Sequence, residues 1–140
     1  MISRRGVRVL LLTITGFNAI SAVGGGIGLL TPGSIGMPLS FLEGSSFTSY
    51  LWPAIILVTV IGGTQAGALV LVARRGRNGL LVSAIAGFAL VIWIFVELAI
   101  MGEFFAIHAI FMTTALVQLA SVIALLGAAP QIVERDPSLG

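Results

Sequence analysis

The residues best suited to chemistry in this sequence are one acid and one imidazole set among long apolar stretches. Glu97 is the single acidic residue inside such a stretch, and His108 opens the next one after a turn at Gly102. A carboxylate and an imidazole at similar depth could respond to protons near neutral pH or anchor the headgroup of a ligand. We expect them to face the protein interior and interact. The alternative is that Glu97 reaches the interface or stays protonated, while His108 lies at that interface.

Three amide side chains form a second polar set within the apolar stretches. Asn18 lies on a helical face of small residues, and Gln118 shares a face with Thr114 and Ser121. Polar groups inside a bilayer are costly and usually face the interior of a helix bundle, so Asn18 and Gln118 can form a direct hydrogen bond where the first and fourth spans are neighbours. Gln65 is interpreted in the same way. These amides could serve a function, or their hydrogen bonds could only stabilise the bundle, by about 0.6 kcal/mol per bond.

The usual signatures of catalysis and of cofactor binding are missing. Cysteine is absent, which excludes disulfides, thiolate metal sites and iron–sulfur clusters. One histidine cannot supply two imidazole ligands to a haem, and one carboxylate beside one histidine is a poor metal site. The run 24–28 is glycine-rich but lacks the lysine of a phosphate-binding loop. We therefore expect no enzyme activity, no cofactor and no metal.

Composition and segment length indicate the elements that position these residues. The chain of 140 residues is 58% hydrophobic and 9% charged, with a mean hydropathy of +1.15, so it has too few charges to cover a soluble surface. A spanning helix needs ~20 apolar residues. Four segments qualify, at 8–30, 51–73, 80–101 and 106–128. We predict a single integral membrane domain over 1–140, an all-α bundle of four transmembrane helices.

All basic residues are arginines, and they predict the orientation. The seven are Arg4, Arg5, Arg8, Arg74, Arg75, Arg77 and Arg135. A four-span topology places them all on one side, and basic residues in short loops are retained in the cytoplasm. Both termini and the tail 129–140 are therefore predicted to be cytoplasmic. The pI near 10.5 then reflects anchoring to the lipid bilayer, and no nucleic-acid partner is expected.

The first span could instead be a secretory signal, since Ser3-Arg4-Arg5 precedes it. Its apolar run continues beyond any cleavage-like site, and Ile20-Ser21-Ala22 lacks the small residue required three positions before a cut. We therefore predict an uncleaved span.

The connection 31–50 is the only long one, and the orientation places it outside. Pro38 suits the start of a short interfacial helix and Gly44 suits its end. Tyr50 and Trp52 are expected at the level of the lipid headgroups, where the second span enters the membrane. Because the same orientation places Glu97 near this loop, a site is expected in the outer leaflet.

Small residues four positions apart predict close packing between helices. The pairs are Gly24 and Gly28, Gly63 and Gly67, and Ser83 and Gly87. In lipid, helices associate through small residues that let their backbones approach. We interpret these pairs as packing within one bundle, with a homodimer face as the alternative.

Several of these motifs resemble a pattern in small, functionally uncharacterised bacterial membrane proteins with four transmembrane helices. The similar stretches are Gly24–Gly26, Thr31–Gly33, Gly36–Pro38, Phe41–Ser45, Phe47, Tyr50–Pro53, Gly87 and Ile92–Ile94 with Glu97. The resemblance implies a multi-pass protein of the bacterial plasma membrane and carries no assigned activity. Where such proteins often have glutamine in the third span, this chain has Glu97.

Two functions are compatible with the sequence. The first is a non-enzymatic accessory or scaffold subunit, acting as a homo-oligomer or within a larger membrane complex. The second is a transporter or channel-like module for a small solute or proton, using Glu97, His108, Asn18 and Gln118. Transporters usually show internal repeats and broken helices, and no convincing repeat is present, so we favour the first. An intramembrane enzyme ranks third.

Overall fold

The computed structural model describes residues 2–133, so Arg135 lies outside the described range. Within 2–133, four helical segments are long and apolar enough to cross a membrane. They are α1 (Arg4–Leu30), the continuous segment α2 (Leu51–Ile56), η3 (Leu57–Gly62) and α3 (Gly63–Ala73), then α4 (Gly79–Met101) and α5 (Ala106–Leu125). The predicted all-α, four-span fold is confirmed.

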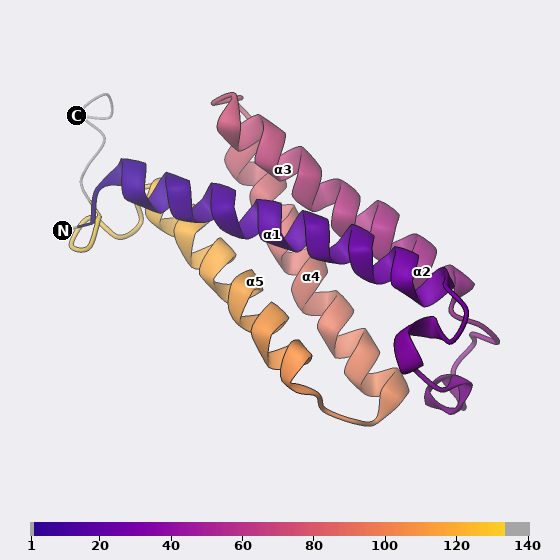
Figure 1. Cartoon of the computed structure of the whole chain (residues 1–140). Coiled ribbons are helices and arrows are strands. Elements are labelled where there is room, and N and C mark those ends of the chain that lie inside the picture. The colour runs from indigo at the N-terminus through magenta and orange to yellow at the C-terminus, as the bar shows by residue number, and fades with distance from the viewer. Residues whose placement is uncertain (1, 134–140) are drawn as a thin grey trace.

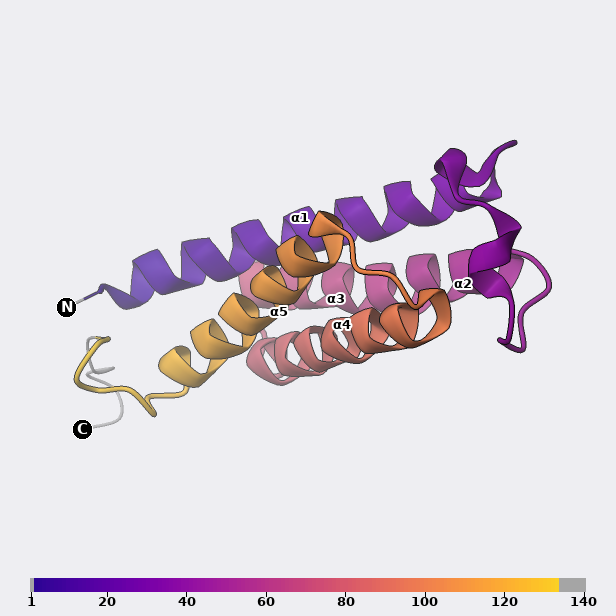
Figure 2. The same ribbon diagram turned by 90° about the horizontal axis from the view of Figure 1, so that it is seen from below.

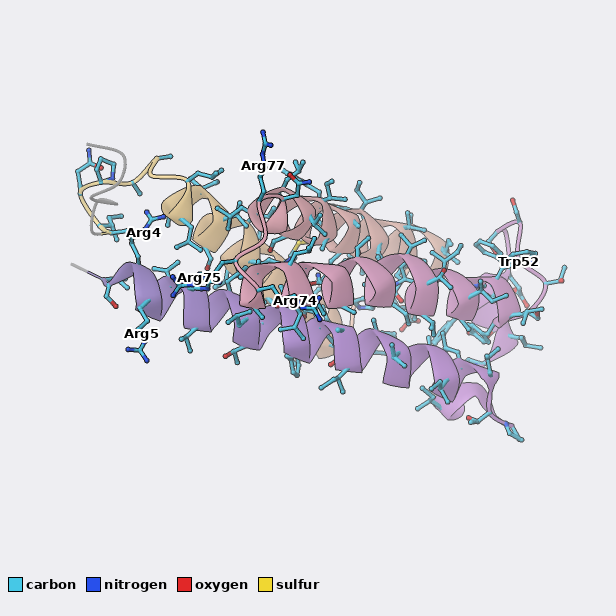
Figure 3. All side chains as sticks on the ribbon, turned by 90° about the horizontal axis from the view of Figure 1, so that it is seen from above. Arg4, Arg5, Trp52, Arg74, Arg75 and Arg77 are labelled. Atoms are coloured by element: carbon cyan, nitrogen blue, oxygen red, sulfur yellow. The ribbon has the colours of Figure 1, made fainter. Side chains whose placement is uncertain are left out.

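The spans form an elongated bundle in which each segment packs against two neighbours (Figure 1). Around the bundle the order is α1, the α2–α3 segment, α4, α5 and back to α1. We call one end the arginine end, because α1 begins there, residues 74–78 turn there and α5 ends there. The opposite end, the loop end, carries residues 31–50 and the turn 102–105. Figure 3 shows Trp52 at the loop end and the labelled arginines away from it.

Outward-facing side chains are apolar along all four spans, as a lipid environment requires. Ile20 is 77% exposed, Phe88 58% and Ile123 53%. Water would penalise exposure of so many large apolar side chains on one small domain. The interior is therefore distinguished by small and polar residues rather than by hydrophobicity.

Local signals decide where the helices begin and end. Ser3 caps α1 by accepting a hydrogen bond from the backbone N–H of Gly6 at 3.0 Å, so the helix begins four residues before the predicted span. Gly102 ends α4 in the left-handed region, at φ 66°, where glycine has no steric penalty. α5 ends at Leu125, three residues before the predicted limit.

The second span contains a π-helical stretch, Leu57–Gly62, that the sequence pattern does not predict. Such stretches insert an extra residue into a helical turn and are rare outside functional or closely packed sites. Here the stretch packs against α1: a Cβ on Gly62 would lie 3.1 Å from Val23. The helical face that meets α1 therefore changes along this span.

The structure corrects part of the predicted glycine packing. Gly24 and Gly63 are exposed, and a Cβ on either would meet nothing within 4 Å, so their predicted role in packing within the bundle is wrong. Gly26 makes the close approach between α1 and the second span instead, because a Cβ there would overlap Val58 and lie 3.0 Å from the carbonyl oxygen of Ala54. Two residues correspond to a rotation of about 200°, so Gly24 and Gly26 face opposite sides.

The other predicted small residues do pack. Gly28 lies against the side chain of Ile35 in the loop, and Gly67 lies against α4. A Cβ on Gly87 would come within 2.9 Å of Leu119 on α5. Ser83 is fully buried. Gly67 and Gly87 thus hold α4 against its two neighbouring spans, whereas Gly28 holds the loop against α1.

The loop 31–50 folds over the loop end in two short 3₁₀ turns, Ser34–Gly36 and Leu39–Leu42. The second turn begins after Pro38, where the sequence predicts a short helix. Tyr50 differs from expectation: it is buried, and its hydroxyl donates to the carbonyl oxygen of Pro38 at 2.7 Å. Its ring therefore fastens the loop to the bundle, whereas Trp52 is 60% exposed.

Two arginines of α1 hydrogen-bond to neighbouring helices at the arginine end. Arg8 donates to the carbonyl oxygen of Val72 at the end of α3. Arg4 donates to the carbonyl oxygen of Leu125 at the end of α5, at 2.7 Å. The last carbonyl groups of a helix have no partner within it, and a cation there is favourable. The basic residues expected only to set orientation thus also join three helices.

Candidate functional site

A cavity of about 660 Å³ lies in the loop-end half of the bundle. Ligand pockets typically measure ~300–1,000 Å³. α1, the π-helical stretch, α4, α5 and part of the loop 31–50 line it. Figures 1 and 2 show that α5 begins farther from the loop end than α4 ends, so residues 102–105 run back along the bundle to reach it. This recession of α5 leaves room among α1, α4 and the loop.

Glu97 and His108 both line the cavity and approach each other. The Nε2 atom of His108 lies 3.8 Å from Oε2 of Glu97. The histidine side chain is 4% exposed and the glutamate side chain 27%. The interaction expected from the sequence is therefore present, and the carboxylate is the more accessible member.

A backbone contact orients the imidazole. Nδ1 of His108 accepts a hydrogen bond from the backbone N–H of Phe105 at 3.0 Å, which caps the start of α5. A ring nitrogen that accepts must carry a lone pair, so the proton of neutral His108 resides on Nε2. That nitrogen is the one that lies 3.8 Å from Oε2 of Glu97. The cap thus fixes both the ring position and the direction of the polar contact.

The remaining wall is mainly apolar. Leu57 and Ile61 of the π-helical stretch line it together with Leu90, Ile94 and Phe111, all of which belong to one packed apolar cluster. Their side chains offer contacts to an apolar body but no hydrogen bond. A guest would therefore meet polar atoms near Glu97 and His108, and again only at the deep end.

Asn18 forms the deep end of the cavity and belongs to a hydrogen-bonded layer. Its Nδ2 donates to Oε1 of Gln118 at 3.3 Å, the contact that the sequence makes possible. Its Oδ1 accepts from the hydroxyl of Thr114 at 2.9 Å. α1 and α5 are therefore joined twice near the middle of the bundle.

The layer continues from α5 to the other spans. Nε2 of Gln118 donates to the carbonyl oxygen of Ser83 at 2.8 Å, and Nε2 of Gln65 donates to that of Ala86 at 3.3 Å. Gln65 does not line the cavity, and its Oε1 is buried without a partner. All four spans are linked by side-chain amides, although Asn18 alone of the three reaches the cavity.

The core is filled on the arginine side of this layer. Leu11 and Thr15 are fully buried there, and Leu11 packs with Val7, Val72 and Val122. No residue lines both this cavity and the one found at the arginine end. Within residues 2–133, then, the loop-end cavity has a floor and does not continue through the bundle.

Sequence reasoning missed three contributors to the site. The loop contributes Ile35 and Phe41 to the cavity, Thr114 bonds to Asn18, and Ser83 accepts from Gln118 rather than only allowing close packing. Thr114 and Ser83 carried a signal, because each shares a helical face with a predicted site residue. For the loop, the sequence predicted a short helix near Glu97, but two short 3₁₀ turns leave no periodic pattern that identifies Ile35 and Phe41 as lining residues.

Comparison with known proteins adds no family to this description. A scan against protein-family models, a search of curated proteins and a search of solved structures each found no match. Among residues 2–133, no group of three His, Cys, Asp or Glu side chains is close enough to hold a metal ion. Function must therefore be inferred from the cavity and its polar groups.

Proposed function

We propose that this chain is a non-enzymatic membrane protein that binds an amphipathic small molecule in the loop-end cavity. The observation that carries the proposal is the cavity itself, whose wall is mainly apolar, with polar atoms on Glu97, His108 and Trp93 near the loop end and on Asn18 and Ser21 at depth. The fitting ligand has one long apolar body and a hydroxyl or amine head. Such a head would donate to the carboxylate of Glu97, which has more acceptor sites than His108 occupies.

The length of the loop-end cavity suits a ligand with a long, lipid-like apolar chain. Asn18 lies twelve residues before the end of α1, a rise of about 18 Å. A molecule that enters from the bilayer gains no hydrophobic free energy, because lipid tails are as apolar as the cavity wall. Packing and the polar head must then provide affinity, and the oriented Glu97–His108 pair provides the head contact.

The floor of the cavity favours holding a ligand over conducting a solute. A proton or solute would have to pass the layer of Asn18 and Gln118 and then the packing around Leu11. This supports the accessory or scaffold role over a channel within one chain. Transport remains the second candidate, because the same cavity could load a substrate if that layer opened.

Orientation and location form part of the proposal. The arginines favour a cytoplasmic arginine end, and the resemblance to small bacterial four-span proteins suggests a bacterial plasma membrane. Because the chain has no cysteine, Ser46→Cys in the loop and Asn78→Cys in the turn 74–78 provide clean reporters. An impermeant thiol reagent added to intact cells should label Ser46→Cys and spare Asn78→Cys. The reverse labelling would overturn the orientation.

Two adjacent glycines offer a matched test of ligand binding. Gly25 lines the cavity, whereas Gly24 faces away and contacts nothing within 4 Å. Gly25→Leu should fill the cavity, while Gly24→Leu adds the same side chain outside it. Trp93 lines the cavity, so with Trp52→Phe in the background its fluorescence reports occupancy by oleyl alcohol or oleylamine.

The expected result is a saturable change in Trp93 emission that Gly25→Leu abolishes and Gly24→Leu preserves. Glu97→Gln should weaken oleylamine about tenfold and oleyl alcohol less, because only the amine is charged. Equal binding by the Gly24 and Gly25 variants would contradict the proposal. Purification in mild detergent would then separate the accessory role, seen as a heteromeric complex, from a homo-oligomer.

A further inference from the structure

The arginine end holds a second cavity, of about 510 Å³, whose chemistry is opposite to that of the first. Five arginines line it, namely Arg4, Arg5, Arg8, Arg75 and Arg77. They come from α1 and from the turn 74–78, which are far apart in sequence. The fold therefore places arginines from two distant segments around one cavity, which orientation alone would not require.

Three of these guanidinium groups have no partner in the described chain. Arg8 and Arg4 donate to carbonyl oxygens at the ends of α3 and α5. Arg5, Arg75 and Arg77 are exposed, and no carboxylate of residues 2–133 lies within 4 Å of their side-chain nitrogens. Figure 3 shows Arg75 reaching along the bundle toward α1.

The local field favours an anion. Arg8 and Arg75 lie close enough to repel each other. α4 begins beside the cavity at Gly79, and no side chain caps its first N–H groups. The start of a helix carries a partial positive charge and uncommitted donors, both of which favour phosphate groups. Every charged group of the described lining has the same sign.

The remaining side chains of the lining are apolar and belong to the ends of the membrane-spanning helices. Val72, Leu80 and Leu125 lie beside the arginines, at the ends of α3 and α5 and the start of α4. An anion that carries acyl chains could place its charge among the guanidinium groups and its chains against the helices. A free anion would use only the first of these two surfaces.

We infer that this cavity is a binding site for the phosphate headgroup of an anionic phospholipid, with Arg75 and the other arginines of its lining as ligands. Planar guanidinium groups bind phosphate oxygens through two parallel hydrogen bonds. The site differs from diffuse attraction to a charged surface because it requires particular arginines. It is also independent of the loop-end cavity, with which it shares no residue.

The test uses the full chain in a neutral detergent and counts bound lipid by native mass spectrometry. Phosphatidylglycerol, phosphatidylcholine and inorganic phosphate would each be titrated. We expect one phosphatidylglycerol per chain, with phosphatidylcholine bound about tenfold more weakly because its choline opposes the arginines. Inorganic phosphate that binds as tightly as the lipid would overturn the lipid assignment.

Arg74 supplies the matched control, since it is exposed in the same turn but does not line the cavity. Arg75→Gln and Arg77→Gln should each weaken phosphatidylglycerol about tenfold, while Arg74→Gln changes it less than twofold. Equal losses for all three variants would show diffuse attraction and overturn the site. Should a turn variant fail to fold, Arg5→Gln on α1 tests the same prediction from outside the turn.

Discussion

The loop end and the arginine end are both hollowed, but their walls have opposite chemistry. The loop-end cavity is lined mainly by apolar side chains and contains one carboxylate–imidazole pair. The arginine end is lined by guanidinium groups, two of which bond to helix carbonyl oxygens. A layer of amides separates the two. The two proposals rest on this difference, since an amphipathic guest would suit the first cavity and a phosphate group the second.

The two ends are also held together by different contacts. At the loop end, the backbones of α1 and the second span approach closely at Gly26, and the ring of Tyr50 fastens the loop. At the arginine end, charged side chains bridge the helices. Backbone contact therefore stabilises the end with the deep apolar cavity, and hydrogen bonds from arginine stabilise the other.

Gly26→Leu should produce the largest loss of stability. Its side chain would overlap Val58 and press on the carbonyl oxygen of Ala54, so we expect a loss of about 3 kcal/mol. Gly24→Leu should change stability by less than about 0.5 kcal/mol, because that position is open. Thermal unfolding in detergent, followed by circular dichroism, measures both. Similar losses would mean that α1 does not meet the second span through Gly26.

Arg8→Gln should cost about 2 kcal/mol, because it removes charge-assisted bonds to the last carbonyl groups of α3. Arg74→Gln is the control, since Arg74 is exposed at the end of the same helix. Chemical unfolding of the two variants would be compared at equal detergent concentration. If Arg74→Gln were as costly, loss of charge rather than loss of the carbonyl bonds would explain stability at this end.

The amide layer should respond unequally at its two glutamines. Gln118→Leu removes the bonds to Asn18 and Ser83 and should cost about 1 kcal/mol. Gln65→Leu also removes a buried Oε1 that has no partner, so we expect a change near zero or a small gain. Unfolding free energies of the two variants provide the check. A larger loss at Gln65 would indicate a further partner for that oxygen.

Tyr50 should give the smallest effect, confined to alkaline pH. Burial raises the pKa of Tyr50 above its ordinary value of about 10. The folded state therefore keeps the phenolic proton more tightly than the unfolded state, so this stabilisation is complete below pH ~10 and is lost as pH rises through the folded pKa. Tyr50→Phe should abolish that loss. As the only tyrosine, Tyr50 can be titrated by ultraviolet absorbance, and an ordinary pKa would contradict its burial.

Hydropathy predicted the four spans within a few residues, because bilayer thickness determines the length of an apolar helix. Polar residues within spans were equally informative: Asn18 meets Gln118, and Glu97 meets His108. The choice between Gly24 and Gly26 was beyond the sequence, since lipid-facing and core-facing positions are both apolar or small. The arginine–carbonyl bonds also depend on how far α3 and α5 extend, which hydropathy does not determine to the residue.

The π-helical stretch Leu57–Gly62 has a consequence for how this span can tolerate change in length. Because one turn holds an extra residue, the spacing of inward-facing positions before the stretch is offset by one residue from the spacing after it. Deleting one residue there would restore an ordinary α-helix and leave Gly63–Ala73 facing as before. Relaxing the stretch to an α-helix at its present length would instead turn Gly63–Ala73 by about 100° relative to Leu51–Ile56. Gln65 would leave the interior, and the turn carrying Arg75 would swing away from α1. One backbone irregularity thus keeps the two ends of the protein in register.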